Sequence, residues 1–157
     1  MNALIKLQKL GIGTVQFGKK YGISNTLEEP NYQEVNKILK LAIKNNISIL
    51  DTASEYGTSE IKIGKSHLKN NFKIITKTVK INSLKITNIE INYVYKSFIN
   101  SLKNLNKKEI YALLIHDLSD LLKPGSKNLV KLIKKIKKNG LIKKIGISLY
   151  DINDTEK

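Results

Sequence analysis

The chain has 157 residues, of which 41% are hydrophobic, and a formal net charge of +15 at pH 7, so we take 1–157 as a single globular domain. It has no cysteine and only two histidines, which excludes disulfides and thiolate zinc sites, and we expect no metal. No apolar run approaches the roughly 20 residues of a membrane helix, and Gly11 interrupts any signal-peptide core, so we expect a cytoplasmic protein without membrane association.

The positive charge raises the question of nucleic-acid binding, because basic surfaces bind phosphate backbones. All 28 basic residues are lysine and none is arginine, whereas recognition of phosphates and bases favours the bidentate guanidinium group. The abundance of lysine, asparagine and isoleucine is typical of an AT-rich genome. We therefore expect no nucleic-acid partner.

Short β-branched apolar runs alternate with amphipathic runs along the chain. In chain order the expected elements are strand Lys9–Val15, helix Tyr32–Asn45, strand Ile47–Leu50, helix Ser59–Lys69, strand Phe72–Thr76, helix Asn92–Leu105, strand Ile110–Ile115, helix Leu129–Lys138 and strand Ile142–Ser148. Thr58 or Ser59 is the expected N-cap of the second helix, and Gly140 is expected to cap the last. A further helix is expected to begin within 151–157.

Strict alternation of strand and helix indicates an α/β protein with a parallel sheet, either doubly wound or a (β/α)8 TIM barrel. A dinucleotide-binding doubly wound fold should carry G-x-G-x-x-G between its first strand and first helix. Here Gly11-Ile12-Gly13 lies within the expected first strand, which favours the barrel. A complete barrel has eight units and about 250 residues. We therefore predict a partial barrel of five strands and four helices, truncated after the fifth strand.

Catalytic groups of such barrels lie at the carboxyl ends of the strands. Asp51, Lys77 and His116 follow the second, third and fourth expected strands, and Tyr56 lies five residues after Asp51, so we expect all four to face one mouth. A phenol with a pKa near ~10 donates a proton poorly at neutral pH, and a nearby ammonium lowers that pKa. Lys77 could do this for Tyr56, Asp51 could keep Lys77 protonated, and His116 could hydrogen-bond a substrate carbonyl.

Each of these residues also has a purely structural interpretation. An aspartate after a strand often caps a loop, a tyrosine before glycine often packs, and one lysine in a lysine-rich chain is weak support. Phe17 and Tyr21 follow the first strand and could line a carbonyl pocket or only pack. His67 lies at a lysine-flanked helix end and is expected on the surface.

Four segments in order resemble the motifs of the aldo/keto reductases. Asp51–Gly57 resembles the D-T-A-x-x-Y-G signature of the family, and Ser59-Glu60 with Ile63-Gly64 resembles its continuation. The segments that resemble the lysine strand, the histidine strand and the G-x-I-[KR]-x-[IL]-G-[VI]-S segment of the family are Lys73–Lys77, Leu114–Asp117 and Gly140–Ser148. The resemblance runs from Leu10 to Tyr150.

The resemblance implies hydride transfer between NADPH and an aldehyde or ketone. It implies Tyr56 as the general acid, Lys77 and Asp51 as its tuning pair, and His116 as the residue that orients the carbonyl. Ser148 corresponds to the serine that contacts the nicotinamide carboxamide, and Thr14 and Asp51 are the other expected cofactor contacts. The asparagine that often follows this serine is Leu149 here. The choice of NADPH over NADH rests on the resemblance alone.

The family holds the cofactor phosphates with loops after its seventh and eighth strands, which lie beyond the five strands expected here. We therefore expect this chain alone to bind NADPH weakly or not at all. Open edges at the first and fifth strands would expose backbone and apolar side chains, and self-association could close them. The alternative to an enzyme is a non-catalytic half-barrel remnant or assembly module. Because a remnant needs none of the four polar residues, their presence favours the enzyme.

Overall fold

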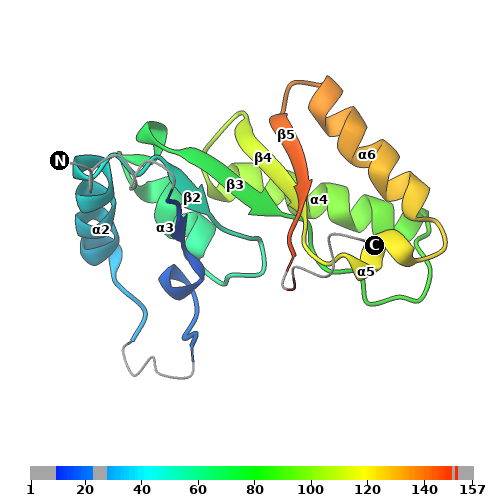
Figure 1. Cartoon of the computed structure of the whole chain (residues 1–157), viewed down its shortest axis with the longest axis horizontal. Helices are drawn as coiled ribbons and strands as arrows, with labels where there is room; N and C mark the ends of the chain where they lie inside the picture. The colour runs from blue at the N-terminus through cyan, green and yellow to red at the C-terminus, as the bar shows by residue number, and fades with distance from the viewer. Residues whose placement is uncertain (1–9, 23–27, 150, 152–157) are drawn as a thin grey trace.

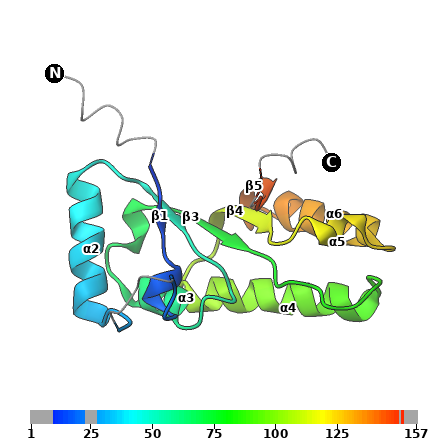
Figure 2. The same cartoon turned by 60° about the horizontal axis from the view of Figure 1, so that its bottom comes forward.

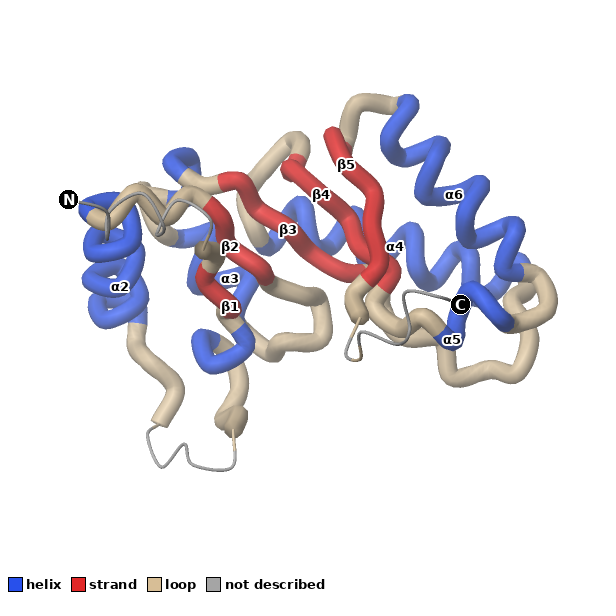
Figure 3. The backbone as a smooth tube through the Cα atoms, in the orientation of Figure 1, coloured by secondary structure: helices blue, strands red, loops and turns tan. Residues whose placement is uncertain are grey.

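The structure is a computed structural model that describes residues 10–22, 28–149 and 151. Within this part of the chain, five parallel strands form one sheet in sequence order (Figures 1 and 3). They are β1 (Ile12–Gly13), β2 (Ile49–Asp51), β3 (Lys73–Lys77), β4 (Ile110–Ile115) and β5 (Ile142–Ile147). The parallel order confirms the predicted α/β class, and it leaves β1 and β5 as the two edges of the sheet.

Helices connect the successive strands. They are α2 (Tyr32–Lys44), α3 (Ser59–Lys65), α4 (Asn88–Asn104), α5 (Ser119–Leu122) and α6 (Ser126–Lys138), with short 3-10 helices η1 (Val15–Phe17) and η2 (Lys69–Asn71). Neighbouring helices contact one another in the order α2, α3, α4, α6. Figure 2 shows α4 running along one side of the strands. This arrangement, strands in order with helices outside, is that of part of a (β/α)8 barrel.

The apolar core lies between the sheet and these helices. Its fully buried members come from every layer, and the largest are Leu39, Leu50, Ile63, Ile74, Leu105, Leu113, Leu129, Ile133 and Ile136. Gly64 permits the close packing of α3 against the end of α4, because a Cβ atom there would lie 1.9 Å from the backbone oxygen of Asn104. Burial of this set supplies the main stabilisation of the fold.

Two helices end or begin where the sequence analysis did not place them. The helix expected over Ser59–Lys69 ends at Lys65, because Ser66 adopts an extended backbone and donates a 2.6 Å hydrogen bond to Asn36 of α2. Thr58 is the N-cap residue of this helix, but its side chain makes no capping bond. Helix α4 begins four residues earlier than predicted, because Thr87 and Glu90 form a capping box.

The first strand is shorter than predicted. Of the range Lys9–Val15, only Ile12 and Gly13 are strand among the described residues, and Val15 belongs to η1. The short helix α5 was not expected. Helix α6 starts at Ser126, three residues earlier than predicted, after Gly125 with a φ of 87°. Gly140 directly follows the C-cap of α6 with a φ of 75°, as its predicted capping role requires. Lys9 and the helix expected within 151–157 fall outside the described residues, apart from position 151.

Candidate active site

The five strands end at one edge of the sheet, and a polar residue stands at or just after each end. The register pairs Gly13 with Asp51, Lys77 with Leu114, and Ile115 with Ile147. These polar residues are Thr14, Asp51, Lys77, His116 and Ser148, each within one position of the carboxyl end of its strand. Because the strands are parallel, their carboxyl ends bring together side chains that are far apart in the sequence.

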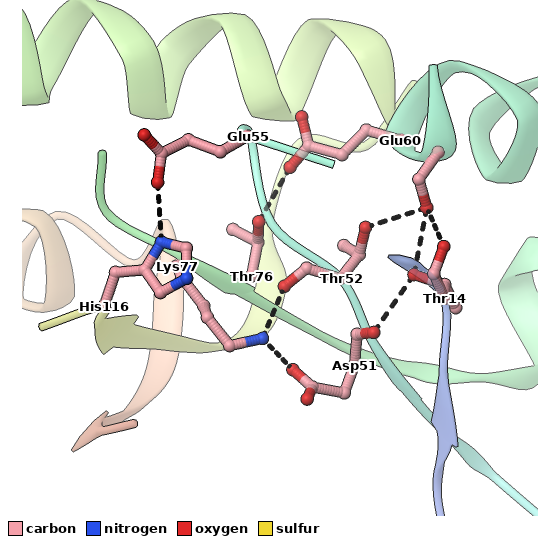
Figure 4. A network of polar contacts seen from close by, with 9 residues as sticks. Thr14, Asp51, Thr52, Glu55, Glu60, Thr76, Lys77 and His116 are labelled. Carbon is pink, nitrogen blue, oxygen red and sulfur yellow. Dashed lines mark hydrogen bonds and ion pairs between the residues drawn. The ribbon is translucent and has the colours of Figure 1, made fainter. Parts of the chain in front are cut away.

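Lys77 contacts several of the polar groups at this edge. Its Nζ atom donates to Asp51 Oδ1 at 2.5 Å and to the Thr52 carbonyl oxygen at 2.9 Å (Figure 4). The Lys77 side chain is 3% exposed and that of Asp51 is 44% exposed. The ammonium also lies 5.0 Å from the centre of the Tyr56 ring. A buried cation is therefore held by one carboxylate and one carbonyl beside the phenol.

His116 also lies beside Tyr56. The two rings meet edge to face, with centroids 6.2 Å apart and planes at 80°. The backbone N–H of His116 donates to Thr78 Oγ1 at 3.1 Å, which fixes the start of the loop after β4. The structure thus brings together all four residues of the predicted catalytic group, Asp51, Tyr56, Lys77 and His116.

The His116 imidazole is buried beside charges of both signs. Burial lowers its pKa below the ordinary value, the Glu55 carboxylate opposes this shift, and the ammonium groups of Lys80 and Lys77 add to it. Because the net shift is downward, the imidazole is mainly neutral at pH 7.

Sequence reasoning missed Glu55 as a partner of His116. Oε2 of Glu55 lies 2.9 Å from Nδ1 of His116, although the approach is off the line of a regular ring N–H hydrogen bond. The contact is therefore primarily electrostatic. Its only sequence signal is the position of Glu55 next to Tyr56, and that spacing does not predict a contact with the end of β4.

Three buried hydroxyl groups join the ends of β1 and β2 to the start of α3. Thr14 Oγ1 is 3.0 Å from the Asp51 carbonyl oxygen, Ser59 Oγ is 2.9 Å from Thr14 Oγ1, and Thr52 Oγ1 is 3.1 Å from Ser59 Oγ (Figure 4). All three residues are fully buried. The Thr14 hydroxyl is thus bonded within the protein. The motif resemblance had included Ser59 without giving it a role.

Close backbone contact fixes the loop that carries Tyr56. A Cβ atom on Gly18 would lie 2.1 Å from the Tyr56 carbonyl oxygen, and one on Gly57 would lie 2.0 Å from the Gly18 oxygen. Gly57 also has a φ of 57°, which favours glycine. The loops after β1 and β2 are therefore in close backbone contact at Tyr56 and Gly57.

Glu60 is a second residue whose role the sequence did not reveal. Its side chain is buried, and its Oε1 atom accepts a 2.7 Å hydrogen bond from Thr76 Oγ1, one residue before Lys77. Burial raises the pKa of Glu60, while the bond from Thr76 lowers it by less. The contact ties α3 to the strand that presents Lys77.

The other residues named in the sequence analysis differ in how far they are buried. Ser148 is half-buried directly after β5, and its N–H donates to the Ile115 carbonyl oxygen at 2.9 Å. Phe17 is buried in the apolar core, whereas Tyr21 is 58% exposed. Of the two interpretations of Phe17, packing is therefore the one that its position supports. His67 is exposed, as predicted.

Fold and site define a protein of the (β/α)8-barrel class with a tyrosine, lysine, aspartate and histidine at the carboxyl ends of its strands. The sequence profile of the Aldo/keto reductase family matches residues 9–157. The chain therefore belongs to the aldo/keto reductase family. No helix within residues 10–22, 28–149 and 151 is both long enough and apolar enough to span a membrane.

Known relatives agree with this assignment. The chain is 29% identical over 133 residues to D-arabinose 1-dehydrogenase of Saccharomyces cerevisiae, covering 80% of this chain and 39% of the yeast protein. A structure assigned to the aldo-keto reductases from Pseudomonas aeruginosa matches with a TM-score of 0.71 and 26% identity, over 90% of this chain and 57% of that one.

An aldo/keto reductase from Klebsiella pneumoniae, solved with NADP and acetate, matches with a TM-score of 0.66 and 20% identity. The alignment covers 93% of this chain and 47% of the Klebsiella chain. This likeness concerns the fold. In each of these comparisons the chain spans less than two thirds of the length of the relative.

Proposed function

We propose that this chain provides the catalytic residues of an oxidoreductase that reduces an aldehyde or ketone with NADPH. The observation that carries the proposal is the contact of the Lys77 ammonium with both the Asp51 carboxylate and the Tyr56 ring. Such an arrangement assists a phenol in giving up a proton, which is the step that carbonyl reduction requires of an acid.

Tyr56 is the general acid. Its hydroxyl proton passes to the carbonyl oxygen as that oxygen gains negative charge. The Lys77 ammonium stabilises the phenolate that remains, because opposite charges attract strongly in a site with little water. Asp51 holds the ammonium in place, and the Thr52 carbonyl accepts a second hydrogen bond from it.

His116 lies beside the phenol and orients the substrate. A hydrogen bond from its ring to the carbonyl oxygen would hold that oxygen within reach of Tyr56. The backbone bond from His116 to Thr78 and the close packing at Gly18 fix the two rings relative to each other. Groups held in place in this way lower the barrier because they need no rearrangement during the reaction.

The polar groups at this edge fit the nicotinamide end of a dinucleotide. The half-exposed Asp51 carboxylate and the half-buried Ser148 would bind the nicotinamide end. Thr14 would contribute indirectly, because its hydroxyl donates to the Asp51 carbonyl oxygen and so fixes the Asp51 backbone. NADPH, when bound, supplies the hydride that reduces the carbonyl carbon. Family membership and the NADP in the Klebsiella pneumoniae structure support this choice of cofactor.

The test is NADPH oxidation with a panel of aldehydes and ketones, together with D-arabinose and NADP⁺ in the reverse direction. We expect Tyr56→Phe to lower kcat/KM by roughly 10²–10⁴-fold, the usual contribution of a general acid. Tyr111→Phe is the matched control, because it removes a phenol hydroxyl from β4, outside the group of four. Equal rates in the wild type and Tyr56→Phe would contradict the role of Tyr56.

The edge strand β5 favours a second candidate, a half-barrel module that pairs with a second copy. Its side chains Ile145 and Ile147 are 39% and 40% exposed, which is unusual for isoleucine in a parallel sheet. No turnover by any variant, together with a dimer in sedimentation velocity measurements, would favour this module. A strict monomer would contradict it.

A further inference from the structure

The Nδ1 atom of His116 is buried and makes no hydrogen bond of regular geometry with the described residues. A buried polar nitrogen without a partner costs free energy, so such atoms are nearly always satisfied in native proteins. The Glu55 carboxylate, 2.9 Å away, is the group placed to satisfy it. Figure 4 shows this carboxylate directed at the ring.

We propose that Glu55 is a positioning residue that keeps the proton of the neutral His116 ring on Nδ1, so that Nε2 is the nitrogen that gains and loses a proton. The Glu55 side chain is 38% exposed, so packing leaves it room to turn its oxygen towards the N–H bond. The assignment of the proton concerns the chain itself. Only its catalytic consequence rests on the proposed reductase function.

The consequence follows from the chemistry of imidazole. A neutral ring carries one N–H group, and when this is on Nδ1, Nε2 can only accept a hydrogen bond. Donation from Nε2 to a carbonyl oxygen then requires the doubly protonated imidazolium. Glu55 favours this form, because a carboxylate stabilises a nearby positive charge. The imidazolium keeps its proton during the reaction, and Tyr56 supplies the one that is transferred.

The other groups that face His116 act against its positive charge. Lys77 comes from β3 and Lys80 from the segment after it, and both ammonium groups disfavour the imidazolium, as does burial. Tyr56 contributes an aromatic ring roughly perpendicular to the imidazole, and Asp117, the next residue in the chain, forms a 3.9 Å ion pair with Lys80. Among the charged side chains that set the pKa of His116, Glu55 is the one that raises it.

The rate of carbonyl reduction should therefore be higher at low pH. Because the donating form is protonated and the pKa of His116 lies below its ordinary value, the rate of reduction falls as the pH rises through that lowered pKa. At neutral pH most molecules carry a ring that accepts at Nε2. Removal of the Glu55 charge should move the fall in rate to still lower pH.

The experiment is an NMR titration of ¹⁵N-labelled imidazole nitrogens in the full chain, which reports both the protonation midpoint and the nitrogen that carries the proton. The chain has two histidines, and the exposed His67 serves as an internal reference. Glu55→Gln keeps an oxygen acceptor but removes the charge, and Glu55→Ala removes both. Glu109→Gln is the charge-matched control, because Glu109 pairs with Lys143, in an ion pair outside the group of four.

We expect the wild type to keep the proton on Nδ1 when the ring is neutral. Glu55→Gln should lower the midpoint and keep this tautomer, and Glu55→Ala should lower the midpoint and shift the proton towards Nε2. Glu109→Gln should change neither. A wild-type ring with its proton on Nε2, or a midpoint unchanged in both Glu55 variants, would overturn the proposal.

Kinetics separate this proposal from the proposed function. If the chain reduces carbonyls, Glu55→Ala should lower kcat/KM by about tenfold, as expected when a group that orients a functional imidazole is lost, and should shift the pH profile to lower pH. Turnover with the proton on Nε2 would refute the role of Glu55 and leave the reductase intact. An Nδ1-protonated ring that responds to the Glu55 variants as expected, without turnover of any substrate, would support the positioning and contradict reduction by this chain alone.

Discussion

The two ends of strand β3 carry the same residue type in opposite circumstances. Lys73 begins the strand, is exposed, and lies 5.4 Å from the centre of the Tyr111 ring. Lys77 ends it, is buried, and bonds to Asp51 and the Thr52 carbonyl. Four residues along one strand separate a cation held by protein ligands from one in water. In a chain with 28 lysines, the residue type alone says little about the role of a lysine. Its position at the carboxyl end of a strand determines whether it lies in the candidate site.

The largest expected difference between paired variants comes from removing each of these lysines in turn. Lys77→Met should lower kcat/KM for carbonyl reduction by at least about 10²-fold, because the Tyr56 phenolate loses its cation. Lys73→Met should change it less than about twofold, since an exposed cation contributes little. NADPH oxidation measured under identical conditions checks both. Similar losses in the two variants would abolish the distinction between the strand ends.

A pair of glycines extends the comparison to the backbone. Gly18→Ala should reduce the free energy of unfolding by about 2–3 kcal/mol, because overpacking of this size forces the backbone to move, and the new Cβ would meet the Tyr56 oxygen at 2.1 Å. Gly13→Ala should cost less than about 1 kcal/mol, since its Cβ would find nothing within 4 Å. Urea denaturation measures both. Equal losses would show that the loops do not pack as described.

The buried Glu60 should make stability depend on pH. Its raised pKa means that the folded chain binds this proton more tightly than the unfolded chain. This contribution is therefore present at low pH, and it is lost as the pH rises from the ordinary value of 4.5 through the raised one. Glu60→Gln should flatten this decline in urea denaturation at a series of pH values. A slope equal to that of the wild type would assign the pH dependence to other groups.

The smallest effect is expected for an exposed ion pair outside the active-site edge. Glu109→Gln breaks a 3.0 Å contact between side chains that are 51% and 61% exposed. Such pairs contribute at most about 1 kcal/mol and often nothing measurable. Urea denaturation should show a change within this limit, and smaller still in 1 M salt. A larger loss would mean that the ion pair is more shielded from solvent than its exposure indicates.

Much of the fold was predictable because it follows local patterns. Strand β4 matches its prediction at both ends, and α2 begins at the predicted residue and ends one residue earlier. The closeness of Asp51, Lys77 and His116 was predictable too, because parallel strands deliver their ends to one edge, and Tyr56 follows Asp51 by five residues. The catalytic roles of these residues stay a prediction. The start of α4 was readable in principle, since Thr87 and Glu90 have the spacing of a capping box.

What could not be predicted depends on contacts between distant segments. Helix α3 ends where it does because Ser66 bonds to Asn36, 30 residues away. The pairing of Glu55 with His116 joins two loops 61 positions apart, and no periodicity encodes it. The burial of Glu60 likewise depends on how α3 packs against β3. Tertiary packing decides each of these, whereas local pattern decides that a strand is present and where it approximately lies.

The hydrogen bonds among the buried hydroxyls of Thr14, Ser59 and Thr52 have a donor-to-acceptor direction that the distances alone do not give. A carbonyl oxygen can only accept, so Thr14 must donate to Asp51. Ser59 Oγ lies 2.9 Å from both the hydroxyl oxygen and the carbonyl oxygen of Thr14, and neither has a proton left for it, so Ser59 directs its own proton at Thr14. Thr52 is left to donate to Ser59. The three protons therefore point in one direction, from Thr52 to Ser59, from Ser59 to Thr14 and from Thr14 to Asp51. Loss of the Ser59 hydroxyl would remove its bonds to both Thr52 and Thr14, so a single serine determines whether the ends of β1 and β2 and the start of α3 share one hydrogen-bonded unit.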